Sequence, residues 1–210
     1  MAKSIYVVWN DEYHPEKTYT AITKKLFGGS DWELQTSYVA QDVLKLEKAP
    51  DLMLNFTVGR PNGVKDMGYT EQGYLKKMVE DGMGIMYVHA GLACIQEFTP
   101  IYEIALGHFA SHPQPHYPTY VCPLPGIDHP ILNGVSVFEE PDEHYFCKID
   151  IKNVKPFLCS RSVAGTEIAG WTHEIGKGRV CCLTPGHTEE MLDKMSTLLL
   201  NSAKWCTRQI

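Results

Sequence analysis

The chain has 210 residues, of which 44% are apolar and 21% are charged, values typical of a globular protein, and we expect one domain spanning residues 1–210. The formal net charge of −6 argues against a nucleic-acid-binding protein, which needs a basic surface. No apolar run approaches the roughly 20 residues that a membrane span requires, so we expect no membrane segment.

The N-terminal part of the chain alternates between β-rich runs and helical patterns. Ser4–Trp9 is almost free of polar residues, which is typical of a strand buried on both faces of a parallel sheet. Thr18–Phe27 has an apolar helical face. The other elements expected here are strands at Trp32–Val39, Asp51–Phe56 and Gly84–Val88 and a helix at Thr70–Glu80. This order predicts an α/β fold of three layers, with a mostly parallel central sheet and helices on both faces.

The C-terminal part begins with a segment rich in proline and histidine, Gly107–Pro130, which we interpret as an ordered loop with a short strand at Thr119–Cys122. Glu167–Thr172 and Arg179–Thr184 flank a short turn with two glycines, which predicts a β-hairpin. Apolar residues at helical spacing then predict one helix from about Glu189 to Trp205.

The seven cysteines include no C-x-x-C pair. Most of them sit in apolar runs, where a free cysteine is a common buried residue. Because disulfides are rare in reducing compartments, we interpret the cysteines as reduced thiols of a cytoplasmic protein. The N-terminus also lacks a signal-peptide pattern and passes directly into a strand.

Polar clusters follow several of the expected strands, and ligands of open parallel sheets bind at the carboxyl ends of strands. The first cluster, Asn10 to His14, is either a solvated loop or a substrate contact made by Asn10 and His14. The second is His89-Ala90-Gly91, which follows its strand as the nucleophile of a nucleophile elbow would. An imidazole at this position can act as a base, an acid or a metal ligand, although a single histidine is also often structural.

Two further clusters belong to the C-terminal part. In Asp142-Glu143-His144-Tyr145 the two carboxylates alternate faces if the segment is extended, so only one enters a site; we select Glu143, with a surface acidic turn as the alternative. His187 precedes a helix that Thr188 is expected to cap. The histidines of the proline-rich region are interpreted as loop anchors, with His112 the one expected near the pocket; the others are His108, His116 and His129.

Seven motifs occur in order along almost the whole chain: VVWNDEYHPE, GIMYVHAGLA, GHFASHP, DHPILNG, DEHY, GWTHEIGKGRV and TPGHTEE. Together they resemble the ThuA-like (trehalose-utilisation) proteins, which are similar in fold to class I glutamine amidotransferases. The resemblance implies a flavodoxin-like, amidotransferase-like fold and a role in the catabolism of trehalose or related disaccharides.

The sequence departs from the amidotransferase pattern at the nucleophile. His187-Thr188-Glu189 keeps the His-x-Glu pair, but the nucleophile position holds His89 instead of cysteine. Cys94 lies five residues further on and is expected within the following helix, away from the elbow. Because acyl-imidazoles hydrolyse readily, glutaminase chemistry is not expected.

The first functional hypothesis is an enzyme that isomerises, eliminates or hydrolyses a sugar or keto-sugar. His89, Glu143 and His187 would be its catalytic groups and, as two imidazoles and a carboxylate, could hold a divalent metal such as zinc, manganese or iron. Without a metal, the same groups could act as general acids and bases. The substrate-binding candidates are Asn10, His14, His112 and Tyr145.

The second hypothesis is a non-catalytic protein that binds or senses a sugar or another small ligand, because fold alone does not specify function. A third is an interaction module in which Tyr117, Tyr120 and Phe138 form part of a subunit contact, with a homo-oligomer as the default expectation.

Overall fold

The computed structural model describes residues 1–58, 67–93 and 95–210, and its elements follow the expected α/β order. The strands are β1 (Lys3–Val8), β2 (Trp32–Ser37), β3 (Leu52–Asn55), β4 (Gly84–Val88), β5 (Gly107–Ser111), β6 (Tyr117–Pro123), β7 (Phe138–Asp142), β8 (Phe146–Ile149), β9 (Lys155–Ser162), β10 (Gly165–Ile175) and β11 (Gly178–Leu183). The helices are α1 (Glu16–Phe27), α2 (Tyr69–Asp81), α3 (Pro100–Ala105), α4 (Glu189–Lys194) and α5 (Ser196–Cys206), with short 3-10 helices η1 (Ala40–Lys45), η2 (His89–Leu92) and η3 (Pro130–Leu132).

One half of the main sheet is parallel. Within the described residues the sheet has nine strands in the order β2-β1-β3-β4-β11-β10-β9-β6-β7, and β5 and β8 form a separate two-stranded sheet. The first five strands in this order, β2, β1, β3, β4 and β11, all pair in parallel. Because β2 and β3 lie on opposite sides of β1, the strand order reverses beside β1, at the kind of switch point where doubly wound sheets bind ligands.

The other half of the sheet is antiparallel. The predicted hairpin is confirmed: β10 pairs with β11, with Ile175 opposite Gly178. Strands β9, β6 and β7 extend the sheet beyond it, each antiparallel to its neighbour. The α/β class is therefore confirmed, but the sheet contains more antiparallel strands than the sequence suggested.

Two further expectations differ from the structure in detail. The segment expected to be a loop with one short strand contains two strands, β5 and β6. The expected last helix is divided into α4 and α5 at Met195. There the Ser196 hydroxyl donates to the Asp193 carbonyl at 2.6 Å, and a side chain that bonds its own backbone in this way competes with a continuous helix.

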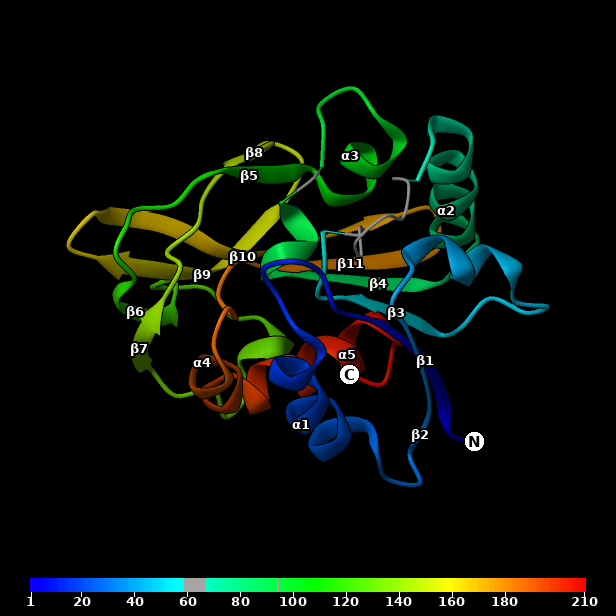
Figure 1. Ribbon diagram of the computed structural model, residues 1–210, viewed down its shortest axis with the longest axis horizontal. Coiled ribbons are helices and arrows are strands. Elements are labelled where there is room, and N and C mark those ends of the chain that lie inside the picture. Colours follow the sequence, from blue (N-terminus) through cyan, green and yellow to red (C-terminus); the bar gives the residue numbers. More distant parts are fainter. Residues whose placement is uncertain (59–66, 94) are drawn as a thin grey trace.

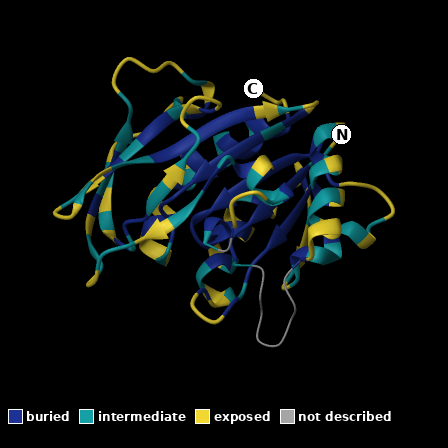
Figure 2. Ribbon diagram, turned by 90° about the horizontal axis from the view of Figure 1, so that it is seen from above, coloured by how far each residue is buried: buried dark blue, intermediate teal, exposed yellow. Residues whose placement is uncertain are grey.

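Helices cover both faces of the sheet, as expected (Figure 1). One apolar core contains Ile22 and Phe27 of α1 together with Leu192 of α4 and Leu199 of α5. The other lies under α2 and α3 and includes residues of η1. Figure 2 shows buried residues concentrated in the central strands and exposed residues on loops and outer helix faces.

No helix in the described part of the chain combines the length and the apolar character needed to cross a bilayer. The six cysteines within the described ranges are free thiols.

Candidate metal centre

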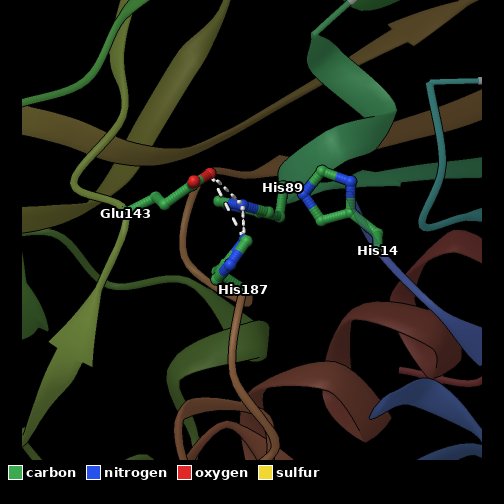
Figure 3. Close-up of side chains that lie close together, drawn as sticks. All are labelled: His14, His89, Glu143 and His187. Carbon is green, nitrogen blue, oxygen red and sulfur yellow. Dashed lines mark hydrogen bonds and ion pairs between the residues drawn. The ribbon is translucent and has the colours of Figure 1, made fainter. Parts of the chain in front are cut away.

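Four side chains converge at the carboxyl edge of the parallel half of the sheet (Figure 3). His14 follows β1, His89 follows β4 and His187 follows β11. Glu143 comes from the connection between β7, at the edge of the antiparallel half, and β8 of the two-stranded sheet. The structure thus brings together the three residues predicted as catalytic and adds His14, which was predicted only as a substrate contact.

His89 sits at a strained turn directly after β4. Its φ of 50° lies in the left-handed region, which is uncommon for a residue with a side chain. Gly91 permits this turn, since a Cβ there would lie 2.4 Å from the carbonyl oxygen of Asn55. The tight strand-to-helix turn agrees with the predicted elbow geometry. Cys94, the nearby thiol considered above, lies outside the described residues.

The orientation of the His89 ring follows from its hydrogen bond to the backbone. The ring is fully buried, and Nδ1 lies 2.9 Å from the Thr184 carbonyl oxygen, to which it donates. Burial lowers the pKa of His89 to about 4, so the ring is neutral. A neutral ring with its proton on Nδ1 presents the lone pair of Nε2 to the cluster.

His14 is held by a buried carboxylate three residues earlier. The Oδ1 atom of Asp11 accepts hydrogen bonds from the backbone N–H of His14 at 2.9 Å and from its Nδ1 at 2.8 Å. Burial raises the pKa of Asp11, but the hydrogen bonds and charge of His14 outweigh it and bring the pKa to about 2. The other ring nitrogen, Nε2, is buried and has no hydrogen-bond partner in the described structure.

Glu143 and His187 complete the group. The Oε2 atom of Glu143 lies 3.2 Å from His89 Nε2 and 3.3 Å from His187 Nδ1. Burial acts to raise the pKa of Glu143, but its hydrogen bond with His187 and the charge of that ring hold it well below its usual range. Burial acts to lower the pKa of His187, and the carboxylates, Glu143 first, raise it overall. Glu143 is therefore ionised.

Asp142, beside Glu143, holds the loop that carries His187. Its two carboxylate oxygens accept the backbone N–H groups of Gly186 and His187, each at 2.9 Å. Burial raises the pKa of Asp142 to about 7. Since Asp142 faces the backbone of the His187 loop and Glu143 faces the imidazoles, these two carboxylates point in different directions, with Glu143 toward the cluster as predicted. Asp142, His144 and Tyr145 are almost fully buried, so the alternative of a surface acidic turn is wrong.

His112 and His116 lie on the other side of the Glu143 carboxylate. Its Oε1 atom is 3.4 Å from His116 Nε2 and 3.7 Å from His112 Nε2. The Tyr145 ring stacks on His89, with 4.0 Å between the ring centroids. The predicted pocket residues His112 and Tyr145 thus border the cluster. His116 borders it as well, although its sequence context gave it no role beyond anchoring a loop.

Asn10 points elsewhere. Its Oδ1 accepts the backbone N–H of Glu16 at 3.2 Å, at the beginning of α1, and its φ of 74° shapes the loop that carries His14. Thr188 caps α4 as predicted, since its hydroxyl accepts the backbone N–H of Met191 at 3.1 Å.

The geometry of the group fits a small divalent ion. Two ligands at about 2.1 Å from a tetrahedral ion are separated by about 3.4 Å. His89 Nε2, His187 Nδ1 and Glu143 Oε2 form a triangle with sides of 3.2, 3.3 and 3.3 Å. The ligand atoms of all four residues, including His14, lie within 4.8 Å of one another. Three imidazoles and a carboxylate could thus hold a metal ion.

The surrounding contacts support the same conclusion. Ligating histidines usually donate their second ring N–H to a carboxylate or a backbone carbonyl, which fixes the tautomer. His14 makes such a contact with Asp11, and His89 with Thr184.

The fold and this site define a class: an α/β protein with a histidine-rich site, rather than a cysteine nucleophile, at the carboxyl edge of its sheet. The family model described as trehalose utilisation, ThuA, matches residues 7–206. The chain therefore belongs to the ThuA family, as its motifs suggested. Comparison with curated proteins gives no match.

Solved structures share the fold. A putative ThuA-like protein from Bacteroides uniformis has 18% identity and a TM-score of 0.75, covering 98% of this chain and 91% of that one. A second, from Parabacteroides merdae, has 15% identity and a TM-score of 0.76, covering 100% and 91%. A β-galactosidase from Rahnella sp. R3 has 12% identity and a TM-score of 0.60, covering 95% of this chain but 31% of its own length.

Proposed function

We propose that this protein is a metal-dependent enzyme that acts on a sugar, in particular a disaccharide or keto-sugar derivative. Its ion, zinc, manganese or iron, would be held by His14, His89, Glu143 and His187. The observation that carries the proposal is the convergence of these four ligand atoms at the carboxyl edge of the sheet. Membership of the trehalose-utilisation family supports the sugar context.

The lone pairs in the group favour a bound cation. Because the His89 Nδ1–H donates to Thr184, a neutral His89 places the lone pair of Nε2 only 3.2 Å from an acceptor oxygen of Glu143. Two acceptors at this distance repel each other unless a positive charge lies between them. The buried Nε2 of His14 has no partner among the residues that the structure describes, and an ion would supply one.

A divalent ion bound here supplies a Lewis acid that polarises a carbonyl or activates water. The chain's own groups would perform the remaining tasks. His112 and His116, partly exposed beside Oε1 of Glu143, are placed to hydrogen-bond substrate hydroxyls. Tyr145 covers one face of His89 and keeps water from it. Isomerisation, elimination and hydrolysis of a keto-sugar can each proceed through such a polarised oxygen.

Metal analysis tests the first half of the proposal. Protein purified without chelator and analysed by plasma mass spectrometry should contain about one zinc, manganese or iron ion per chain. His89→Ala and His14→Ala should lose the ion. His108→Ala is the matched control, since His108 contacts Phe109 and Glu97 outside the group, and it should retain the ion. If His89→Ala and His14→Ala both retain the metal, the assignment of these ligands is wrong.

Activity tests the second half. The metal-loaded protein would be incubated with keto-glycosides and their parent disaccharides, and products followed by NMR, with Glu143→Gln as the inactive comparison. Turnover that disappears in this variant would support an enzyme. Saturable binding of the same sugars without turnover would favour the alternative, a non-catalytic sugar-binding protein.

A further inference from the structure

A cavity of about 170 Å³ lies next to the candidate metal centre, at the carboxyl ends of β3 and β4 and under α2 and α3. None of the described residues that line it carries a charge. Its apolar wall is made of methionines and aliphatic residues, which come from strands, helices and loops. The polar side chains among the described lining residues are Gln41, Asn55, Thr57, Gln72, Tyr87, Gln96 and Thr99.

The cavity differs from the metal centre in its chemistry. Its described lining residues include none of the four candidate ligands, and the hydrogen-bonding side chains among them are neutral amides and hydroxyls. A neutral lining gives no compensation for burying a charged ligand, whereas amides and hydroxyls among apolar groups suit an uncharged, hydrogen-bonding one.

Several of these polar groups retain bonding capacity. Asn55 uses Oδ1 to accept the backbone N–H of Thr57 at 3.1 Å, and within the described structure its Nδ2 has no partner. The side-chain amide of Gln96, an exposed residue on the cavity wall, is likewise without a partner among the described residues. Tyr87 also lines the cavity, is fully buried and has an unpaired hydroxyl in the same part of the structure.

The size of the cavity restricts the ligand to about one ring, since an engineered protein cavity of about 150 Å³ accommodates benzene. The cavity is also connected to His14 through one side chain, the carboxylate of Asp11. Thr57 and Val58, which line it, donate to Oδ2 of Asp11 at 2.9 and 3.0 Å, and Oδ1 of the same carboxylate holds His14.

We propose that this cavity is a second binding site, for an uncharged single-ring polyhydroxy compound such as a monosaccharide or cyclitol. The site is separate from the imidazole group and does not require the metal. Asn55 and Gln96 provide hydrogen-bonding amides, and the methionine and aliphatic wall packs against the C–H face of the ring.

Calorimetric titration of the chelator-treated full chain with D-glucose and myo-inositol tests the proposal. At least one should bind with one-to-one stoichiometry, and glucose 6-phosphate should bind at least tenfold more weakly because no cation lines the described wall. Gln96→Ala should weaken binding about three- to tenfold, the worth of one hydrogen bond. Ala40→Met, which places a longer side chain in the cavity, should abolish binding.

Two controls make the result decisive. Glu97→Ala alters the exposed neighbour of Gln96, which does not line the cavity, and should bind as the unchanged protein does. His89→Ala should also bind normally, because the site is independent of the imidazoles. The proposal is overturned if neither neutral compound saturates the protein, if Gln96→Ala and Glu97→Ala behave alike, or if His89→Ala abolishes binding. These outcomes do not depend on whether the protein is a metalloenzyme.

Discussion

Replacing Asp11 by asparagine tests the idea that one buried carboxylate supports both the fold and the metal centre. Its Oδ1 accepts from the backbone of Tyr13 and His14 and from the His14 ring, at 2.8 to 2.9 Å. Its Oδ2 accepts from Thr57 and Val58. Asparagine has a single acceptor oxygen, so an Asp11→Asn side chain that keeps the three Oδ1 contacts turns its NH₂ toward Thr57 and Val58.

The expected cost follows from these contacts. The Thr57 hydroxyl can rotate and accept, but the backbone N–H of Val58 cannot, and it loses a bond to a charged group worth about 1.5–3 kcal/mol. The remaining bonds lose their charge-assisted component, so we expect a decrease of about 3 kcal/mol in the free energy of unfolding. Metal affinity should fall about 10- to 100-fold, as for other groups that orient metal ligands.

Urea denaturation at pH 7, with the midpoint and slope fitted together, measures the stability change for the metal-free protein. Asp31→Asn is the matched control because Asp31 is exposed, and it should change stability by less than about 0.5 kcal/mol. An Asp11→Asn protein as stable as this control, with unchanged metal affinity, would refute the reasoning.

Three further predictions follow from particular contacts. Gly91→Ala should destabilise the protein by about 1–3 kcal/mol in urea denaturation, because the new Cβ would lie 2.4 Å from the backbone carbonyl at the end of β3; Gly73→Ala, with open space around it, should not. Burial lowers the pKa of His173 to about 4, so the unfolded chain binds the additional proton and stability falls as the pH decreases from about 6.5 toward 4. His173→Phe should make this acid limb shallower, and parallel limbs in both proteins would contradict the assignment. Finally, Cys122 and Cys159 face each other on β6 and β9 with their sulfurs 3.2 Å apart, so a thiol oxidant such as diamide should join them, with the loss of two hydrogen atoms in the intact mass and no such loss in Cys122→Ser.

The sequence predicted the central parallel strands well, because β3 and β4 are buried at every position and β1 along most of its length. The run Gly84–Val88 is buried at every position, and such a strand shows as an unbroken apolar stretch. Strands of the antiparallel half lack this signal. β7 reads Phe-Glu-Glu-Pro-Asp, and an edge strand that carries proline and charge does not differ in composition from a loop.

The candidate site could be predicted only in part for a related reason. Glu143 was found because alternation along an extended segment is a local property. The approach of His116 to Glu143 depends on how the connection from β5 to β6 folds over the sheet, which no local pattern contains. The ligand geometry of His14 depends on its turn back to Asp11, with a positive φ at Asn10, so only a polar cluster could be predicted there from the sequence.

The origin of the four candidate ligands also has a kinetic consequence. The imidazoles come from the parallel half of the sheet, whereas Glu143 follows β7, the edge strand of the antiparallel half, and is 54 residues from His89. Contacts of such long sequence separation form slowly, because the chain must close large loops before they are made. Until the antiparallel half has formed, the refolding chain lacks the carboxylate ligand, so capture of the ion with full affinity should mark a late step of refolding.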